Sequence, residues 1–301
     1  MEVRESFVAA RDGTRIWWRS AGAGGPPVLF TDGIGCAGFI WDRLFPALAA
    51  SRRVLHWNYR GHGKSERPAD LGHCTVSDCV DDLLAVLDAA GERTAVLAGH
   101  SMGVQISLEA HRRAPHRVEG LLLALGSPAQ PLETFHGSRA LAQIFPVLKQ
   151  AIVAFPAAAR IFFQRLFPTE LSLQLGIWLE VNRQLVRRED VRRYLEDLSR
   201  VDPEVWVHML DSAAAHDATD HLPRIAVPAL VIGGEKDTFT PVELSHRMHR
   251  AIPGSELLVL AGGSHMGLLE HAELVELRVQ KFLSEHLPVR PAAAPPAQGA
   301  A

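Results

Sequence analysis

The first 125 residues alternate between short apolar segments and helical patterns. Thr75 and Asp78 can cap a helix whose apolar residues recur on one face until Gly91. Strands that alternate with helices at such short spacing form a parallel sheet with helices on both faces. The sequence therefore predicts an α/β fold. The apolar segments expected to be buried strands are residues 28–31, 54–57, 94–98 and 118–125.

An all-helical stretch then interrupts the alternation. Strand and helix signals resume at residues 229–233, 242–251, 257–260 and 266–287. We interpret the interruption as a cap over the edge of the sheet where the strands end. The expected division is a core with a doubly wound, mostly parallel sheet, residues 1–127 and 222–287, and a helical cap, residues 128–221. The Pro/Ala-rich tail, residues 288–301, has almost nothing to bury and is expected to be disordered.

Composition and charge exclude several classes of protein. Hydrophobic residues make up 47% of the 301 residues and charged residues 22%, as in a globular chain. With 31 basic and 34 acidic side chains the formal net charge is −3, so the chain lacks the basic surplus that binds nucleic acid. Three cysteines without a repeated spacing argue against a disulfide framework and favour a reducing, cytoplasmic location. Polar residues interrupt the most apolar stretch, residues 141–167, and no secretory signal is apparent, so we expect no membrane span.

The most informative motif is Gly99-His100-Ser101-Met102-Gly103, between an expected strand and an expected helix. A serine on such a tight turn adopts a strained conformation, and only small neighbours avoid clashes with the adjoining strand and helix. The N-terminus of the following helix favours negative charge that develops near the serine. These features predict a nucleophile elbow with Ser101 as the nucleophile.

At these residues the chain resembles the α/β-hydrolase superfamily, and most of all its lipase, esterase and haloperoxidase-like branch. The resemblance extends to about residue 287 and implies a nucleophile, an acid and a histidine in that chain order. It assigns these roles to Ser101, Asp237 and His265. Asp237 follows an expected strand in Gly234-Glu235-Lys236-Asp237 and matches the family's position better than the rival acid Glu235. Asp237 could also serve only to cap the next helix.

His265 lies in the loop Gly262-Gly263-Ser264-His265-Met266, where the family places its general base. His100, beside the serine, is expected to point away from it. A neutral imidazole can take the serine proton and return it to a leaving alcohol. A buried carboxylate fixes the imidazole tautomer and stabilises the cation that forms. The three groups together predict acyl transfer.

The resemblance also implies an oxyanion hole made of two backbone N–H groups. One belongs to Met102, the residue after the nucleophile. The other is expected from Ile34, because Asp32-Gly33-Ile34-Gly35 stands where the family has His-Gly-x-Gly. Asp32 departs from that pattern. Backbone donors tolerate this change, whereas the side-chain packing of the loop must differ.

Other motifs do not support a cofactor or a metal. Gly63-Lys64-Ser65 resembles the end of a Walker A loop, but Asn58 stands where that loop needs glycine. The stretch from Tyr59 to Gly63 is common in the superfamily and is interpreted as structural. Several side chains could suggest a metal site, yet no HExxH motif or cysteine spacing accompanies them, so we expect none. They are His208, His216, Asp217, Asp220 and His221.

The expected cap has an apolar half and an arginine-rich half. The apolar half, residues 141–167, is expected mainly to pack the cap on the core and to make the substrate pocket apolar. The arginines stand among acidic neighbours and predict a solvated helix face, with an anionic membrane or an acyl carrier as a minor alternative. They are Arg183, Arg187, Arg188, Arg192, Arg193 and Arg200.

The pattern as a whole predicts a serine hydrolase that cleaves a small or medium carboxylic ester with an apolar group and needs no cofactor. Ser101 argues against the epoxide hydrolases and haloalkane dehalogenases of this fold, which use an aspartate. Cleavage of carbon–carbon bonds, lactones or thioesters, and perhydrolysis, can use the same triad and stay open. So does a ligand-binding protein that keeps the fold and hardly turns over.

Overall fold

The structure, a computed structural model of the chain, describes residues 2–130, 132, 138–179, 182 and 184–289. Of the expected disordered tail, residues 290–301 therefore lie outside the described residues, and so does Arg183.

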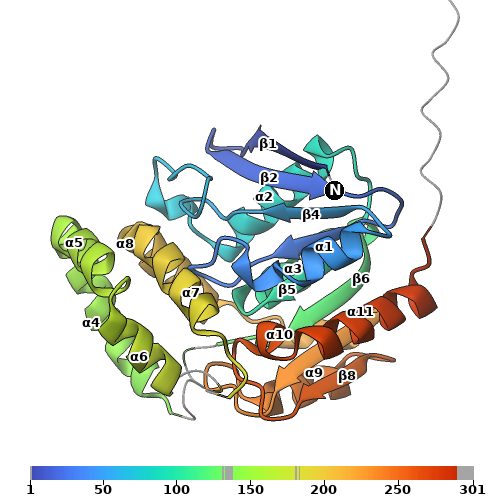
Figure 1. Cartoon of the computed structure of the whole chain (residues 1–301). Helices are drawn as coiled ribbons and strands as arrows, with labels where there is room; N and C mark the ends of the chain where they lie inside the picture. The colour runs from blue at the N-terminus through green and yellow to red at the C-terminus, as the bar shows by residue number, and fades with distance from the viewer. Residues whose placement is uncertain (1, 131, 133–137, 180–181, 183, 290–301) are drawn as a thin grey trace, which may run out of the picture.

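The core is an eight-stranded sheet in the order β1-β2-β4-β3-β5-β6-β7-β8 (Figure 1). β1 and β2 form an antiparallel hairpin at one edge, and β2 also pairs antiparallel with β4. The strands from β3 to β8 are mutually parallel. The predicted α/β fold with a mostly parallel sheet is confirmed. The strands are β1 (Val3–Ala9), β2 (Arg15–Ala21), β3 (Val28–Thr31), β4 (Val54–Trp57), β5 (Ala95–His100), β6 (Val118–Ala124), β7 (Ala229–Gly234) and β8 (Glu256–Leu260).

Two layers of helices bury the faces of this sheet. Successive side chains of a strand point to opposite faces, so Leu29 and Leu97 belong to one hydrophobic cluster while Phe30 and Ala98 belong to the other. The first cluster includes residues of α2 (Val76–Ala89), α3 (Met102–Arg113) and α9 (Val242–Ala251). The second includes residues of α1 (Leu44–Ala49) and α11 (Ala272–His286). Continuous apolar strands are what a sheet covered on both faces requires.

The predicted capping residues start α2. The Thr75 hydroxyl accepts from the Asp78 N–H while the Asp78 carboxylate accepts from the Thr75 N–H, a capping box. After this helix Gly91 takes a φ of +74°, which favours glycine.

The single helix expected over residues 266–287 is wrong, because the chain breaks at His271 into α10 (Gly267–Glu270) and α11. The Glu270 carboxylate accepts from the backbone N–H groups of Ser264 at 2.8 Å and Asn182 at 2.9 Å. These bonds hold the short α10 against the loop that precedes it and against the segment between α6 and α7.

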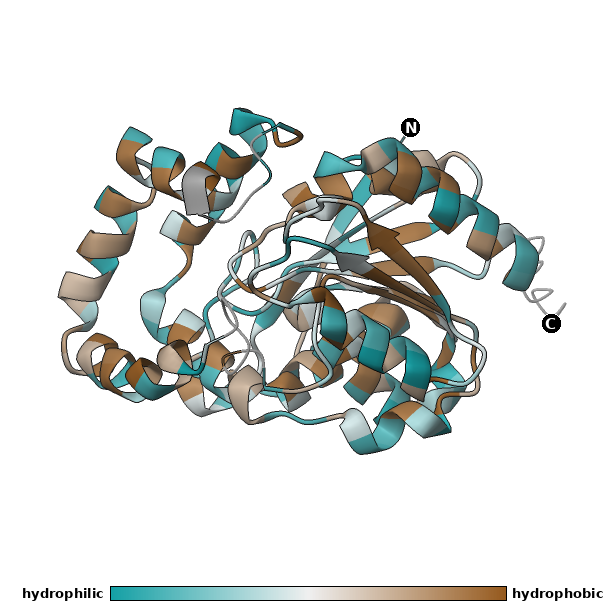
Figure 2. Cartoon of the chain, turned by 90° about the horizontal axis from the view of Figure 1, so that it is seen from below, coloured by the Kyte–Doolittle hydropathy of each residue, from teal (hydrophilic) through white to brown (hydrophobic). Residues whose placement is uncertain are grey.

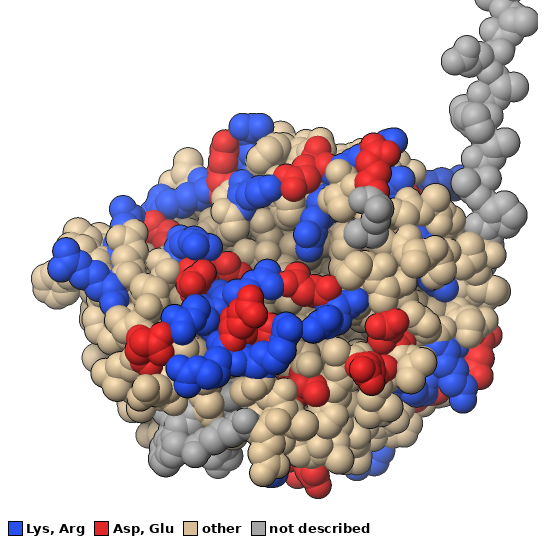
Figure 3. Space-filling model, in the orientation of Figure 1, with Lys and Arg blue, Asp and Glu red and all other residues tan. Residues whose placement is uncertain are grey.

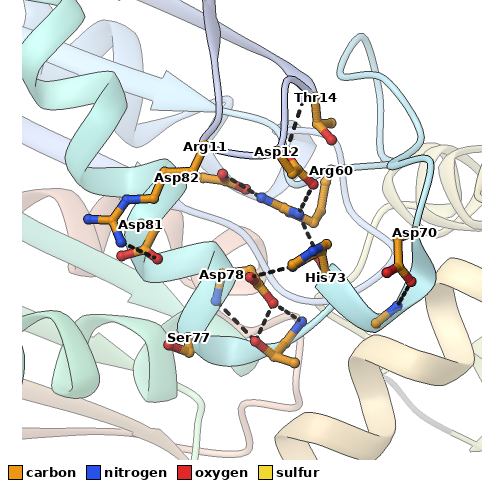
Figure 4. Close-up of polar contacts among 12 residues, drawn as sticks. Arg11, Asp12, Thr14, Arg60, Asp70, His73, Ser77, Asp78, Asp81 and Asp82 are labelled. Carbon is orange, nitrogen blue, oxygen red and sulfur yellow. Dashed lines mark hydrogen bonds and ion pairs between the residues drawn. The ribbon is translucent and has the colours of Figure 1, made fainter.

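Arg60 joins three parts of the core (Figure 4). Its guanidinium donates two hydrogen bonds to Asp82 on α2, at 2.7 and 2.9 Å, and one to Asp12 in the β1–β2 turn at 3.0 Å. It also donates to the His73 carbonyl at 2.6 Å. Burial alone would lower the pKa of Arg60, but the hydrogen bonds to Asp82 raise it above its ordinary value. This network fits the structural role expected for the Tyr59–Gly63 stretch.

In the described part of the segment between β6 and β7, five α-helices lie on one side of the core in Figure 1, and we call them the cap. Several short 3₁₀ helices complete the connections, among them η1 (Phe39–Trp41), just after β3, and η6 (Thr219–Arg224), between the cap and β7. The cap helices are α4 (Ala140–Ala154), α5 (Pro156–Leu166), α6 (Glu170–Leu179), α7 (Arg188–Arg200) and α8 (Pro203–Ala215).

The sequence predicts that the apolar half of the cap mainly packs on the core, and this prediction is wrong. Phe145, Ile152 and Phe163 are buried, but five large apolar side chains of α4, α5 and their junction are more than half exposed. Figure 2 shows hydrophobic residues along these helices. In the described part of the chain no single helix is long and apolar enough to cross a membrane, although α4 and α5 reach that length as a pair bent by 107°. The exposed residues are Ile144, Val147, Phe155, Ile161 and Phe162.

Basic and acidic side chains alternate on the surface over α7 (Figure 3). Arg187 pairs with Asp190 at 2.7 Å, and Arg192 pairs with Glu170 at 2.6 Å. This mixed surface fits the solvated face expected for the arginines.

Candidate active site

Ser101 occupies the sharp turn between β5 and α3. Its backbone has φ 55° and ψ −117°, a conformation that L-residues rarely adopt. A Cβ at Gly99 would lie 2.2 Å from the Gly103 carbonyl oxygen, and one at Gly103 would lie 2.4 Å from the Thr31 carbonyl oxygen. Both flanking positions therefore require glycine, and the turn raises Ser101 at the end of the strand.

The register of the sheet brings the neighbouring loops to Ser101. Thr31 pairs with Gly99, so the loop after β3 runs beside the serine turn. Gly234 pairs with Leu260, so the loops that carry Asp237 and His265 also leave the sheet side by side.

His265 lies between the other two predicted triad residues. Its Nε2 is 3.0 Å from the Ser101 Oγ, and its Nδ1 is 2.9 Å from the Asp237 Oδ2. The serine hydroxyl donates to Nε2 when the imidazole is neutral, and Nδ1–H donates to the carboxylate. The Phe239 ring stacks on the imidazole with ring centres 4.8 Å apart. The structure thus brings together the three residues in the order that acyl transfer uses.

Asp237 is buried and held from several sides. Its carboxylate accepts from the backbone N–H groups of Phe239 at 2.9 Å and Thr240 at 2.8 Å, and from the Thr240 hydroxyl at 2.8 Å. The helix-capping alternative is wrong, because the residue before α9 is Pro241 and no described side chain caps the helix. Asp237 instead stabilises the turn before α9 and contacts His265. The rival acid Glu235 points elsewhere, and its carboxylate accepts from the Gly262 N–H at 2.7 Å.

His100 supports the base rather than the nucleophile. Its Nε2–H donates to the His265 carbonyl at 3.1 Å, and its ring does not hydrogen-bond to Ser101. Burial, assisted by the nearby His265, lowers the pKa of His100 to about 3, so the ring stays neutral. The sequence motif placed His100 in the turn, but its bond to a residue 165 positions away has no sequence signal.

The loop that is expected to supply an oxyanion donor, residues 33–38, follows β3, and we call it the oxyanion loop. Ile34 and Met102 both line the cavity at Ser101. The unexpected Asp32 turns into the core, where its carboxylate bonds to the His56 Nε2 at 2.8 Å, and the Tyr59 hydroxyl donates to the Asp32 carbonyl. The sequence analysis missed His56, although a lone histidine within the apolar segment 54–57 was a usable signal.

Two side chains hold the backbone of this loop. The Gly35 N–H donates to the His62 Nε2 at 3.1 Å, while the His62 Nδ1–H donates to the Arg60 carbonyl at 3.1 Å. The Ala37 N–H donates to the Asp197 carboxylate of α7 at 3.1 Å. Burial lowers the pKa of His62 to about 4, so at neutral pH this ring is an acceptor for the loop.

The depressed pKa of His62 predicts a loss of stability in acid. The unfolded chain takes up a proton near pH 6.5 and the folded chain only near pH 4, so the contribution of His62 is present above pH 6.5 and is lost as the pH falls toward 4. Between pH 7 and pH 5 the free energy of unfolding should fall by about 2 kcal/mol more in the wild type than in His62→Gln. Glutamine can still accept from the Gly35 N–H but does not titrate. Urea unfolding at both pH values measures the difference, and equal losses in the two proteins would contradict it.

Two apolar chambers meet at Ser101. The chamber under α8 has a volume of about 240 Å³ and the chamber under α7 about 270 Å³. Ile34, Ser101, Tyr194 and Phe239 line both. Among the described residues, no Asp, Glu, Lys or Arg lines either chamber. The α8 chamber includes Met102, Gln105, Phe145, Leu148, Trp206 and Leu210, and the α7 chamber includes Cys36, Phe39, Leu195, Leu198 and His265.

Three of the five side chains considered for a metal have partners within the protein. His216 bonds to Glu109 at 3.2 Å, Asp220 to Arg112 at 2.6 Å, and His221 to the His111 Nδ1 at 2.8 Å. Asp220 and His221 thereby tie η6 to α3, and His216 ties the end of α8 to the same helix.

Residues 26–272 match the model of a protein family described as the alpha/beta hydrolase fold. The chain belongs to the α/β-hydrolase fold family. This match covers most of the sequence and includes Ser101, Asp237 and His265, and it confirms the resemblance found in the sequence.

Relatives of this α/β-hydrolase chain differ in their described activities. The chain is 33% identical to the dihydrolipoyllysine-residue acetyltransferase component of an acetoin cleaving system from Pseudomonas putida. The alignment spans 273 residues and covers 90% of the chain and 66% of that protein. The chain is 25% identical to a hydrolase from Pseudomonas aeruginosa PA01, with a TM-score of 0.77 over 93% of the chain and 98% of that structure. A thermophilic esterase from Thermogutta terrifontis shares the fold, with a TM-score of 0.77 and 23% identity. The match covers 94% of the chain and 99% of the esterase structure.

Proposed function

We propose that the protein is a serine hydrolase that cleaves carboxylic esters with apolar groups through an acyl-enzyme. The observation that carries the proposal is the bonded series Ser101–His265–Asp237, with distances of 3.0 and 2.9 Å, at the junction of two apolar chambers. Membership of a family rich in hydrolases agrees with it.

The first half of the reaction forms the acyl-enzyme. The Ser101 Oγ attacks the ester carbonyl carbon while its proton moves to the His265 Nε2. The carbonyl oxygen becomes an oxyanion, which accepts from the N–H groups of Met102 and Ile34. When the tetrahedral intermediate collapses, the carbon–oxygen bond to the alcohol breaks and His265 returns the proton to the leaving oxygen. Asp237 keeps the imidazole oriented and balances its positive charge.

The second half repeats these steps with water. His265 takes a proton from the water, which attacks the acyl carbon, and the proton then returns to Ser101 as the carboxylic acid leaves. None of these steps needs a cofactor, and we propose none.

The lining of the two chambers assigns a place to each part of the substrate. The leaving alcohol must lie beside the group that protonates it, and His265 lines the α7 chamber but not the α8 chamber. We therefore place the alcohol in the α7 chamber. The acyl chain then extends from the same carbon into the α8 chamber, next to Met102.

The apolar lining predicts a preference for acyl chains of intermediate length. Each buried methylene contributes about 0.8 kcal/mol, close to a fourfold gain in binding. With p-nitrophenyl esters, kcat/KM should rise from acetyl to butyryl or hexanoyl and then level or fall as the chamber fills. If the chain binds equally in the ground and transition states, the rise appears mainly in KM. A flat profile, or one highest for acetyl, would contradict the apolar acyl site.

Two variants sharpen this test. Leu210→Trp narrows the α8 chamber and should shorten the preferred acyl chain without changing the preference among alcohols. Leu195→Trp narrows the α7 chamber and should act on the alcohol instead. Reversed effects would exchange the two assignments but leave the serine mechanism in place.

The same assay separates esters from the other bonds that this triad can cleave. We propose a panel of p-nitrophenyl esters beside a lactone, a thioester and a carbon–carbon ring-cleavage product, with perhydrolysis measured separately. Faster turnover of one of the latter would redirect the proposal. No turnover of any, together with binding of the intact compounds, would favour a ligand-binding role.

We also propose a cytoplasmic location. Cys36, Cys74 and Cys79 are all buried free thiols, which agrees with a reducing compartment. The partner expected at the site is a small molecule rather than a nucleic acid or a membrane.

A further inference from the structure

The cap helix α7 contacts the oxyanion loop and η1 at four places. Asp197 accepts from the Ala37 N–H at 3.1 Å. The next residue, Leu198, packs so closely on Gly35 that a Cβ there would lie 2.9 Å from the Leu198 Cδ1. Nearer the start of α7, the centre of the Tyr194 ring lies 5.9 Å from that of the Phe39 ring in η1. Arg193 forms an ion pair with Asp42, the residue after η1.

The loop depends on these contacts because its own hydrogen bonds are few. Within residues 33–38, the described backbone N–H bonds are those of Gly35 to His62, Cys36 to the Gly33 carbonyl and Ala37 to Asp197. One of these three acceptors thus belongs to the cap. Glycines at positions 33, 35 and 38 leave the backbone little conformational restraint of its own.

We propose that Asp197 is a positioning residue that fixes the oxyanion loop, so that the oxyanion hole is complete only while α7 is seated on the core. The inference rests on the proposed function for its catalytic consequence, since the Ile34 N–H is a donor of the proposed hole. Asp197 touches neither the substrate nor the reacting atoms in this scheme. It acts through the backbone between Ala37 and Ile34.

The burial of Asp197 is consistent with a defined position. Its side chain is 18% exposed. Besides the hydrogen bond from the Ala37 N–H, its carboxylate makes an ion pair with Arg200 at 3.7 Å. A carboxylate bonded to a backbone N–H makes a stronger hydrogen bond than a neutral acceptor does. Small displacements of a preorganised donor are costly in catalysis, because the donor must meet the oxyanion at hydrogen-bond distance.

The kinetic test compares Asp197→Ala, Asp197→Asn and Glu196→Ala. Alanine removes the acceptor and should lower kcat for p-nitrophenyl butyrate by about 30-fold, less than the 10²–10³ for outright loss of an oxyanion donor, with KM within about twofold. Asparagine keeps an acceptor oxygen and should retain activity within about threefold. Glu196 stands beside Asp197 on the same helix, and among the described residues its carboxylate pairs only with Arg200, at 3.8 Å, so its variant is the matched control.

A transition-state analogue distinguishes positioning from general damage. Butyl trifluoromethyl ketone forms a tetrahedral adduct with a serine and places an oxyanion in the hole. Its inhibition constant should rise in Asp197→Ala by the same factor by which kcat/KM falls, while the binding of butanol, an uncharged alcohol that places no oxyanion in the hole, stays unchanged. Thermal unfolding of each variant shows that it is folded. A folded alanine variant with wild-type kcat, or with a change confined to KM, would overturn the proposal.

Hydrogen exchange tests the same contact without turnover. In Asp197→Ala, amide exchange in residues 33–42 should rise about tenfold, with no change in Glu196→Ala and little in Asp197→Asn. If the wild type hydrolyses no ester, the proposed function fails and exchange still decides whether α7 fixes the loop. If ester hydrolysis depends on Ser101 but loop exchange is the same in all variants, the positioning role fails alone.

Discussion

Replacing Ser101 by alanine should lower the rate of ester hydrolysis by about 10⁶, the size of effect found when a triad nucleophile is removed. The variant keeps the elbow, because alanine is no larger than serine and the flanking glycines are unchanged. It loses the Oγ that bonds to the His265 Nε2 at 3.0 Å and that would form the acyl-enzyme. The measurement is the turnover of p-nitrophenyl butyrate by the folded variant.

A matched serine controls for the effect of the substitution itself. Ser107 is buried on α3, the helix that follows Ser101, and its hydroxyl donates to the Gly103 carbonyl at 2.7 Å. It lines neither chamber. Ser107→Ala should remain active. An organophosphonate should label Ser101 in the wild type and nothing in Ser101→Ala. A folded Ser101→Ala protein that kept more than about a hundredth of the wild-type rate would refute the nucleophile, given the expected loss.

Asp237→Asn should lower turnover by about 10⁴, because the asparagine amide favours the wrong imidazole tautomer. An acceptor oxygen remains for the Phe239 and Thr240 N–H groups, so the turn should survive. An amide N–H₂ facing His265 would make Nδ1 the acceptor and Nε2 the donor, and Nε2 could then no longer take the serine proton. The measurement is kcat for p-nitrophenyl butyrate at neutral pH.

Glu235→Gln is the control for this change. Glu235 lies two residues away, carries the same charge and bonds to the Gly262 N–H rather than to His265. Its variant should keep most of the activity. If Glu235→Gln proved the more damaging of the two, the proposed acid would be misplaced by two residues.

Features set by local sequence were predicted well. The apolar segment 28–31 is β3 with the same bounds, and the Thr75–Asp78 pair does form a capping box. The elbow was predictable because its requirements, a tight turn with small neighbours, fall within five consecutive residues. The resemblance to the α/β-hydrolases, through the family's chain order, pointed to Asp237 and His265. Both follow strands whose parallel register brings their loops together.

Features set by contacts between distant residues were not predicted. The bond from Asp197 to Ala37 joins residues 160 positions apart, and the Asp32–His56 pair depends on which side of its loop Asp32 faces. The apolar residues of α4 and α5 were expected to be buried because burial is their usual fate, yet a helix pattern alone does not tell which neighbour covers it. The break at His271 arises from side-chain bonds of Glu270 to other loops.

The proposed triad and the proposed donor Ile34 stand on loops of the core, and the other proposed donor, Met102, begins the core helix α3. Much of the chamber lining, in contrast, comes from one continuous insertion between β6 and β7. Mutations in that insertion can therefore alter which molecules fit while the reacting groups stay in place. Related chains are free to diverge in specificity through α4 and α8. The side of α7 that meets the oxyanion loop is the exception, because Asp197 and Leu198 act there on the core itself. Selection for a new substrate would have to leave that side of the helix intact.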